Sequence, residues 1–189
     1  MSADHRSLTR RRALALAGVA CAGLALPDLS AASVHRGRPV PQLEPLFDMA
    51  GTLASPQEVG ATPSGRRRIF MLTDGSFAGP LGRGSILPGG GDWLVQRADG
   101  SSELDVRLTL RTDDDALIYM RYRGILEMSS EVVARRTRGE AVSADDYYFR
   151  TTPVFETAAA KYAWLNRIVS VGVGEITATG VAYSVYAVR

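Results

Sequence analysis

Hydrophobic and polar residues alternate along most of the chain after residue 42. The segment Glu103–Thr112, ELDVRLTLRT, shows this well: its apolar residues would share one face of a strand, with Asp105 and Arg107 on the other. Similar segments between Gly, Pro and Asp turns predict strands at 43–53, 67–73, 92–98, 103–112, 116–123, 147–151, 168–176 and 180–188. Many short strands at close spacing indicate an all-β antiparallel barrel or sandwich.

Two polar segments are typical of hairpin turns. ADGSS at 98–102 and TDDDA at 112–116 each join one predicted strand to the next. The three aspartates of TDDDA invite comparison with a calcium loop, but the spacing of such a loop and its closing glutamate are absent. We therefore interpret TDDDA as a turn and predict no metal site.

One stretch has helical periodicity instead. In PVFETAAAKYAWLNR at 153–167, Pro153 suits a first helical turn and Glu156 lies near the positive end of the helix dipole. Phe155, Tyr162 and Leu165 fall on one stripe. The sequence predicts a single short amphipathic helix here, packed against the sheet.

The glycine-rich stretch LPGGGDW at 87–93 leads into a predicted strand. Phosphate-binding glycine loops lead into a helix N-terminus instead, so we expect no nucleotide site. Two interpretations stay open. The stretch is either a plain sharp turn or a low-bulk strand entry that lets backbone approach a ligand and presents Asp92 and Trp93 to a pocket.

The first 32 residues have the features of an export leader. TRRRALA at 9–15 matches the twin-arginine pattern, with Arg10 and Arg11 as the pair, and the apolar run that follows is short for a membrane span. The small residues of LSAAS predict cleavage after Ala32, with a lipid anchor on Cys21 as an alternative. We expect a leader at 1–32, a linker at 33–42 and one domain at 43–189, which the twin-arginine translocase delivers to the periplasm or the medium.

Removal of the leader would leave a neutral domain. The whole chain has 22 basic and 20 acidic residues, and the leader contains four arginines and two aspartates. A neutral domain lacks the positive charge on which nucleic-acid binding rests, so we expect no nucleic-acid partner. The runs Arg66–Arg68 and Arg135-Arg136-Arg138 are interpreted as solvated charge at loops or strand ends.

Cysteine and histidine chemistry would be lost with the leader. Cys21 is the only cysteine, and of the two histidines His5 lies in the leader and His35 in the linker. A thiol nucleophile, a cysteine metal site or a histidine-based triad is therefore not expected. We predict no cofactor, and any proton transfer falls to carboxylates, tyrosines, arginine-supported groups or water.

Several blocks together resemble a known family. LFDMAGTL, GRRRIFMLTDGSFAGP, RGSILPGGGDW, DGSSELDVRLTLRTDDDALIYMRYRG, DYYFRTTPVFETAAAKYAWLN and the closing VGVG and VYAV occur in order over residues 43–189. They are similar to domain-of-unknown-function family 3237. The resemblance implies a single antiparallel calycin-like β-barrel with a short helix and a cavity for one small ligand. It also implies a relation to cyclases or isomerases of aromatic or polyketide-like molecules.

The resemblance also implies candidate site residues. Asp92, Asp105 and Arg150 are the candidates for catalysis, and the candidates for ligand binding are Trp93, Arg107, Tyr148, Glu156, Trp164 and Asn166. The position of Asp105 stays open. If the leucine face lines the barrel, Asp105 points to solvent or a partner chain; if the interior is polar, Asp105 and Arg107 form an ion pair in the cavity.

Three functions remain in competition. The first is a cofactor-free cyclase, isomerase or lyase in which Asp92 or Asp105 exchanges a proton and an arginine stabilises negative charge. The second is a periplasmic carrier of a small apolar molecule. The third is a packing module whose polar residues hold the helix to the barrel. A small organic ligand is the expected partner, and an exposed aromatic strand edge would allow a homodimer.

Overall fold

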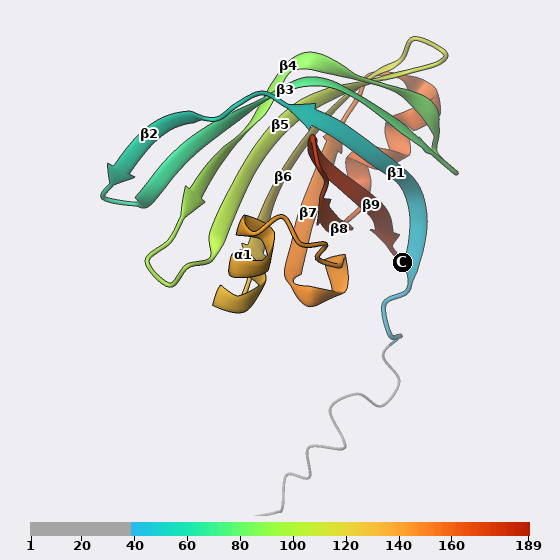
Figure 1. Cartoon of the computed structure of the whole chain (residues 1–189). Helices are drawn as coiled ribbons and strands as arrows, with labels where there is room; N and C mark the ends of the chain where they lie inside the picture. Colours follow the sequence, from blue (N-terminus) through green and yellow to red (C-terminus); the bar gives the residue numbers. More distant parts are fainter. Residues whose placement is uncertain (1–38) are drawn as a thin grey trace, which may run out of the picture. The chain divides into compact units, whose positions relative to one another are not determined.

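Nine antiparallel strands account for most of the computed structural model, which describes residues 39–189 (Figure 1). They are β1 (Leu43–Leu53), β2 (Gln57–Thr62), β3 (Gly65–Gly79), β4 (Gly82–Gln96), β5 (Ser102–Thr112), β6 (Leu117–Glu127), β7 (Tyr148–Glu156), β8 (Ser170–Ile176) and β9 (Gly180–Val188). Three short helical segments complete the fold: α1 (Ser130–Thr137), η2 (Ala144–Asp146) and η3 (Ala160–Arg167). The predicted leader and its Cys21 lie outside the described residues.

The sheet closes on itself as a barrel. Neighbouring strands follow the order β1-β9-β8-β7-β6-β5-β4-β3-β2, and a further pairing of β1 with β3 joins the two ends. Met49 of β1 lies opposite Phe77 of β3 in that closing ladder. Eight strands therefore form a closed antiparallel barrel, while β2 pairs only with β3 and extends beyond the ring (Figure 1). The predicted antiparallel barrel is confirmed.

Strand alternation places the apolar residues inside. Along β5, Leu104, Val106, Leu108 and Leu110 are buried, whereas Arg107 and Arg111 are exposed. Leu110 lies beside Ile118 of β6, and both are fully buried together with Met120. The leucine face lines the barrel because burying those side chains removes apolar surface from water. This settles the open position of Asp105, which lies on the outer face.

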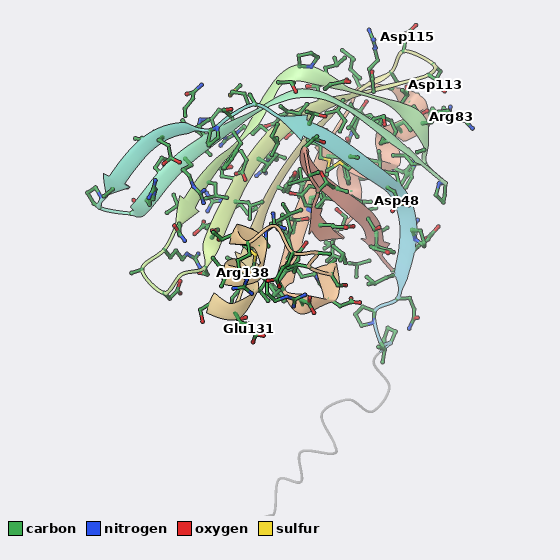
Figure 2. All side chains as sticks on the ribbon, viewed as in Figure 1. Asp48, Arg83, Asp113, Asp115, Glu131 and Arg138 are labelled. Carbon is green, nitrogen blue, oxygen red and sulfur yellow. The ribbon has the colours of Figure 1, made fainter. Side chains whose placement is uncertain are left out.

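One end of the barrel is packed shut. Tyr162 and Leu165 of η3 are buried there, and the ring of Phe47 meets those of Phe77 and Phe155 edge-on at centroid distances of 5.4 and 6.1 Å. The hairpin turn between β5 and β6 holds η3 in place. Figure 2 shows Asp113, Asp115 and Arg83 at this end, far from Glu131 of α1 and from Arg138, which follows α1.

The TDDDA turn contributes one anchoring carboxylate. Asp114 accepts hydrogen bonds from Lys161 Nζ at 2.7 Å and from the Tyr162 hydroxyl at 3.0 Å. Together with the bond from the Thr112 hydroxyl, these contacts lower the pKa of Asp114 well below its ordinary value. Asp115 has a positive φ of 60°, as expected in a tight turn. The turn interpretation of TDDDA is confirmed.

The helix predicted at 153–167 is wrong in type and extent. Residues 153–156 continue β7, where Phe155 is buried beside Met120, and only Ala160–Arg167 is helical, as a 3-10 segment. The stripe of Phe155, Tyr162 and Leu165 is buried, but it comes from two elements. The helical spacing of these three residues is therefore a coincidence. Phe155 belongs to a strand, whereas Tyr162 and Leu165 belong to the separate segment η3.

The α-helix of the described chain is α1, which the sequence analysis did not predict. Ser129 caps its N-terminus by accepting a hydrogen bond from the backbone N–H of Val132, and Arg135 and Arg136 occupy its last turn. Val132 is its buried residue. Within residues 39–189, no helix has the length and apolarity to cross a bilayer.

Candidate functional site

A cavity of about 630 Å³ occupies the end of the barrel next to α1. Strands β3 to β9 contribute residues to its walls. The end of β1, the helix α1 and adjoining loop residues contribute the rest. The apolar part of the wall includes Phe70, Leu94, Leu104, Leu126 and Phe149. Polar side chains, among them Arg66, Arg68, Asp92 and Arg136, make up the rest of the wall, and a pocket of this size that combines apolar walls with polar groups suits a small molecule.

Asp92 is the carboxylate that lines this cavity. It lies on β4 between Gly91 and Trp93, and the alternation of the strand directs it inward together with Leu94. Its side chain is only 9% exposed. The Oδ1 atom accepts one hydrogen bond, from the backbone N–H of Asp105 at 3.1 Å.

The glycines before Asp92 form a bulge in the middle of β4. Pairing of β4 with β5 is interrupted between Leu87 and Gly91, and Gly89 has a positive φ of 98°. A side chain at Gly90 would place its Cβ 2.6 Å from the carbonyl oxygen of Arg107, so only glycine fits between the strands. The plain-turn interpretation of LPGGGDW is therefore wrong: the glycines bend a continuous strand just before the buried carboxylate.

Burial governs the ionisation of Asp92. Loss of hydration raises its pKa from an ordinary value of 3.8 to about 7, and the nearby negative charge of Asp105 adds to this increase. The hydrogen bond from the Asp105 backbone and the charges of Arg67 and Arg68 act in the opposite direction but do not compensate for burial. Both the protonated and ionised forms of Asp92 are accordingly present near neutral pH.

Two buried tyrosines lie next to Asp92 in the interior of the barrel. A void of about 30 Å³ is lined by Asp92, Tyr122 of β6 and Tyr183 of β9, and this is room for about one water molecule. The rings of Tyr122 and Tyr183 meet edge-on at a centroid distance of 5.4 Å, and burial raises the pKa of each hydroxyl well above its ordinary value. Both tyrosines are therefore neutral, and they give Asp92 a polar neighbourhood without charge.

Three arginines line the cavity near its opening. Arg66 and Arg68 alternate with Phe70 on the inner face of β3, and Arg136 comes from α1. Arg66 is paired with Glu58 of β2, with Nη2 to Oε2 at 3.0 Å. The Nε atom of Arg68 is buried without a hydrogen-bond partner in the described residues, and its guanidinium lies 5.5 Å from the centre of the Phe70 ring.

Trp93, Asp105 and Arg107 lie on the outer face of the barrel. Arg107 pairs with Asp105 at 3.3 Å and lies 5.3 Å from the Trp93 ring centre. The hypothesis that Asp105 and Arg107 form an ion pair inside the cavity is wrong, because the inward positions of β5 are taken by leucine and valine. Asp105 acts on the site through its backbone N–H, which donates to Asp92, and through its negative charge.

Arg150 and Tyr148 also face outward. Phe149, between them, is buried in the barrel, while the Arg150 guanidinium donates to the carbonyl oxygen of Phe149 at 2.9 Å and lies 5.3 Å from the Tyr148 ring centre. No acidic side chain forms an ion pair with Arg150 within residues 39–189. Arg150 is not among the residues that line the cavity that holds Asp92.

The remaining candidates belong to the packed end. Glu156 is exposed at the end of β7, and Trp164 of η3 is half-buried against Arg189. Asn166 makes two hydrogen bonds of 2.9 Å to the backbone of Thr157 and so ties η3 to the end of β7. The structure does not bring these three residues to the cavity that holds Asp92.

The sequence analysis missed the three arginines, which it interpreted as solvated charge. The alternation of GRRRIFML contained the signal, since Arg66 and Arg68 share a face with Phe70 and Leu72. Arg136 could not be placed, because the helix that carries it was not predicted. Over residues 39–189, no three histidine, cysteine or acidic side chains gather in a cluster that would hold a metal ion.

Comparison with known proteins identifies relatives across the whole barrel. Residues 41–188 match the model of a family described as "Protein of unknown function (DUF3237)". A UPF0311 protein of Clostridium acetobutylicum is 37% identical over 123 residues, 65% of this chain and 78% of the relative. A UPF0311 protein of Rhodopseudomonas palustris is 32% identical over 127 residues, 67% of this chain and 83% of the relative.

Solved structures share the barrel. A "beta-barrel like protein" from Acinetobacter baumannii superimposes with a TM-score of 0.71 at 37% identity, over 82% of this chain and 99% of the other. A conserved protein of unknown function from Rhodopseudomonas palustris gives 0.75 at 30% identity, over 80% and 100%. An enzyme from Penicillium herquei gives 0.61 at 22% identity, over 80% and 98%, which is a likeness of fold alone.

Proposed function

The chain belongs to the DUF3237 family, and from the cavity in its barrel we propose that it binds a small organic molecule and exchanges a proton with it through Asp92. One observation carries the proposal. A buried carboxyl group that accepts a single hydrogen bond lies in the same cavity as Arg68, a cation without an ionic partner in the described residues. Such pairs of acid and cation are typical of sites for acid–base chemistry.

The proposed reaction needs no external oxidant or cofactor. Ionised Asp92 would take a proton from a carbon next to a carbonyl group, and the electron pair of that C–H bond would move onto the carbonyl oxygen. The enolate oxygen would face the positive arginines, which favour it over the neutral ketone. Protonated Asp92 would then return the proton to the same carbon, which gives exchange, or to another carbon of a conjugated enolate, which gives isomerisation.

The ionisation of Asp92 suits both halves of this cycle. A general acid–base group works best when its pKa is close to the working pH, because both of its forms are then available. A pKa of about 7 for Asp92 meets that condition. The apolar walls, with Phe70 and Phe149, suit an aromatic or polyketide-like body.

A carrier that does not transform its ligand is the alternative. The apolar wall of the cavity favours it, because such a surface holds a ring system without any need for proton transfer. In that case Asp92 would serve as a hydrogen-bond donor in its protonated form. Export of the protein to the periplasm or the medium is part of either proposal, and it rests on the TRRRALA pattern and the apolar run after it.

The decisive experiment follows hydrogen–deuterium exchange on an enolisable bicyclic ketone. We expect the protein to accelerate exchange of the α-protons of 2-tetralone in D₂O, measured by NMR, with a rate that rises with pH and levels off above about pH 7. Asp92→Asn should reduce the protein-dependent rate by about 100-fold or more while 2-tetralone still binds. Asp113→Asn, at the packed end, is the matched control and should exchange at the wild-type rate.

Two outcomes would contradict proton transfer by Asp92. Equal acceleration by the wild type and by Asp92→Asn would remove this carboxyl from the reaction. Binding of 2-tetralone without acceleration by either protein would favour the carrier.

A further inference from the structure

We infer that the cavity selects organic anions, namely a carboxylate or an ionised enol or phenol attached to an apolar ring body, and that Arg68 is the residue that recognises the charge. The inference rests on the proposed function in that it assigns a ligand class to the same cavity. It does not depend on whether Asp92 transfers a proton.

Arg68 has unused hydrogen-bonding capacity inside the cavity. Its Nε atom is buried and has no partner, and in residues 39–189 no carboxylate oxygen lies within 4 Å of its guanidinium. Asp92 shares the cavity but makes its one hydrogen bond to the backbone of Asp105. An arginine cannot lose its charge in a protein, and the buried Nε–H of Arg68 is a hydrogen-bond donor that an oxygen of a ligand would satisfy.

The other charged groups of the cavity leave it positive. Arg136 on α1 makes no ion pair within the described residues, and Arg66 shares its charge with Glu58. Asp92 is the only acidic residue among those that line the cavity. Positive side chains in a partly enclosed apolar cavity attract anions more strongly than they would in open water.

The walls define the rest of the ligand. The Phe70 ring lies beneath the Arg68 guanidinium, and Leu94, Leu126 and Phe149 complete an apolar surface. A bare phosphate or sulfate ion would satisfy the arginine but leave those walls wet. A ring system with one acidic group would cover the walls and place its oxygens on the planar, forked donor of Arg68, which suits carboxylates better than a lysine would.

The test compares two probes that share a shape and differ in charge. We expect isothermal titration calorimetry at pH 8 to show 2-naphthoate binding at least tenfold more tightly than the neutral 2-naphthamide. Arg68→Met keeps much of the side-chain volume and removes the donor, so it should abolish that preference. Arg83→Met makes the same change in net charge at the packed end and should retain it.

Folding of the variants is monitored separately. Arg68→Met should melt close to the wild-type temperature, because the buried Nε atom that it removes makes no hydrogen bond within residues 39–189. Arg68→Lys, which keeps the charge without the planar fork, should retain part of the preference for 2-naphthoate and so guards against a trivial loss of structure.

The outcomes separate this inference from proton transfer. Equal affinity of the wild type for 2-naphthoate and 2-naphthamide would overturn the inference, and so would an equal loss of preference in Arg83→Met. A preference that depends on Arg68 supports it even if 2-tetralone exchange is absent. If 2-tetralone exchange depends on Asp92 but 2-naphthoate binds no more tightly than 2-naphthamide, the proposed reaction is supported and the inference that the cavity selects organic anions is overturned.

Discussion

A single residue, Asp92, carries the acid–base argument because burial works against its charge. With a pKa of about 7 in place of 3.8, the folded protein holds the proton in a pH range where the unfolded chain has released it. The free energy of unfolding therefore falls as the pH rises through this range. The same burial that readies Asp92 for proton exchange destabilises the barrel at neutral pH.

This cost predicts a difference in pH dependence between the wild type and Asp92→Asn. Asparagine has a similar shape and does not ionise, so the variant should gain up to about 4 kcal/mol in free energy of unfolding relative to the wild type between pH 4 and pH 8. Urea unfolding at several pH values measures the free energy of unfolding of both proteins. The contributions of all other titrating groups are the same in both proteins and cancel when the two values are subtracted. Asp113→Asn should follow the wild type, and parallel curves for Asp92→Asn would contradict a raised pKa.

The sequence allowed Asp92 to be chosen but not the residues around it. An acid after three glycines at a strand start is a local signal, and the structure places that acid in the cavity. Asp105 and Arg150 looked equally suitable, yet they lie outside, because Leu104 and Phe149 take the inward positions next to them. Side-chain direction follows from the face that is buried, which an isolated motif does not reveal.

At the scale of elements, the bulge in β4 positions the site. Gly90 approaches the backbone of Arg107 and Leu108 so closely that a Cβ at this position would lie 2.6 Å from the Arg107 carbonyl oxygen and 3.0 Å from the Leu108 Cα. That backbone belongs to β5, the strand that also supplies the N–H of Asp105 to the Asp92 carboxylate. Pushing β4 away from β5 at Gly90 would disturb the one hydrogen bond that Asp92 accepts.

Gly90→Ala is therefore expected to affect both stability and the site. The free energy of unfolding should fall by about 2–3 kcal/mol, since the obstructing atoms are backbone and cannot rotate away. The affinity for 2-naphthoate should fall as well. Gly89→Ala tests positive φ alone, because its Cβ would meet nothing within 4 Å, and it should cost about 1 kcal/mol. Wild-type stability and affinity in Gly90→Ala would show that the strands separate freely.

Two elements were predicted wrongly, for different physical reasons. Phe155 alternates with its neighbours as a strand residue and also stands at helical spacing from Tyr162, so either assignment fitted. For α1 the signals were present and specific. Ser129 as the cap, Glu131 in the first turn, and Arg135 and Arg136 in the last all favour a helix. Its eight residues are too short for a clear periodic pattern.

The whole molecule divides its tasks between the two ends of one barrel. Aromatic packing and η3 fill one end, while α1 and the inner faces of β3 and β4 line the cavity at the other. In Figure 1, α1 lies at the end of the barrel away from η3. Strand alternation and the ordered family blocks were enough to predict the barrel. The pairing of β1 with β3 that closes the barrel depends on contacts between segments far apart in the sequence. The same is true of the position of the cavity, and local periodicity does not encode such contacts.

The first 32 residues are expected to direct export of the full chain. Cleavage after Ala32 would remove none of the residues that form the barrel, because the compact unit begins at Val40. Replacing Arg10 and Arg11 with lysine keeps the charge but changes the pair that the twin-arginine translocase reads, so the full-length precursor should stay in the cytoplasm. Cell fractionation with mass spectrometry should find the wild type exported and beginning at Ser33. Arg6→Lys, in the same segment but outside the pair, should be exported normally, and normal export of the double lysine variant would exclude this route.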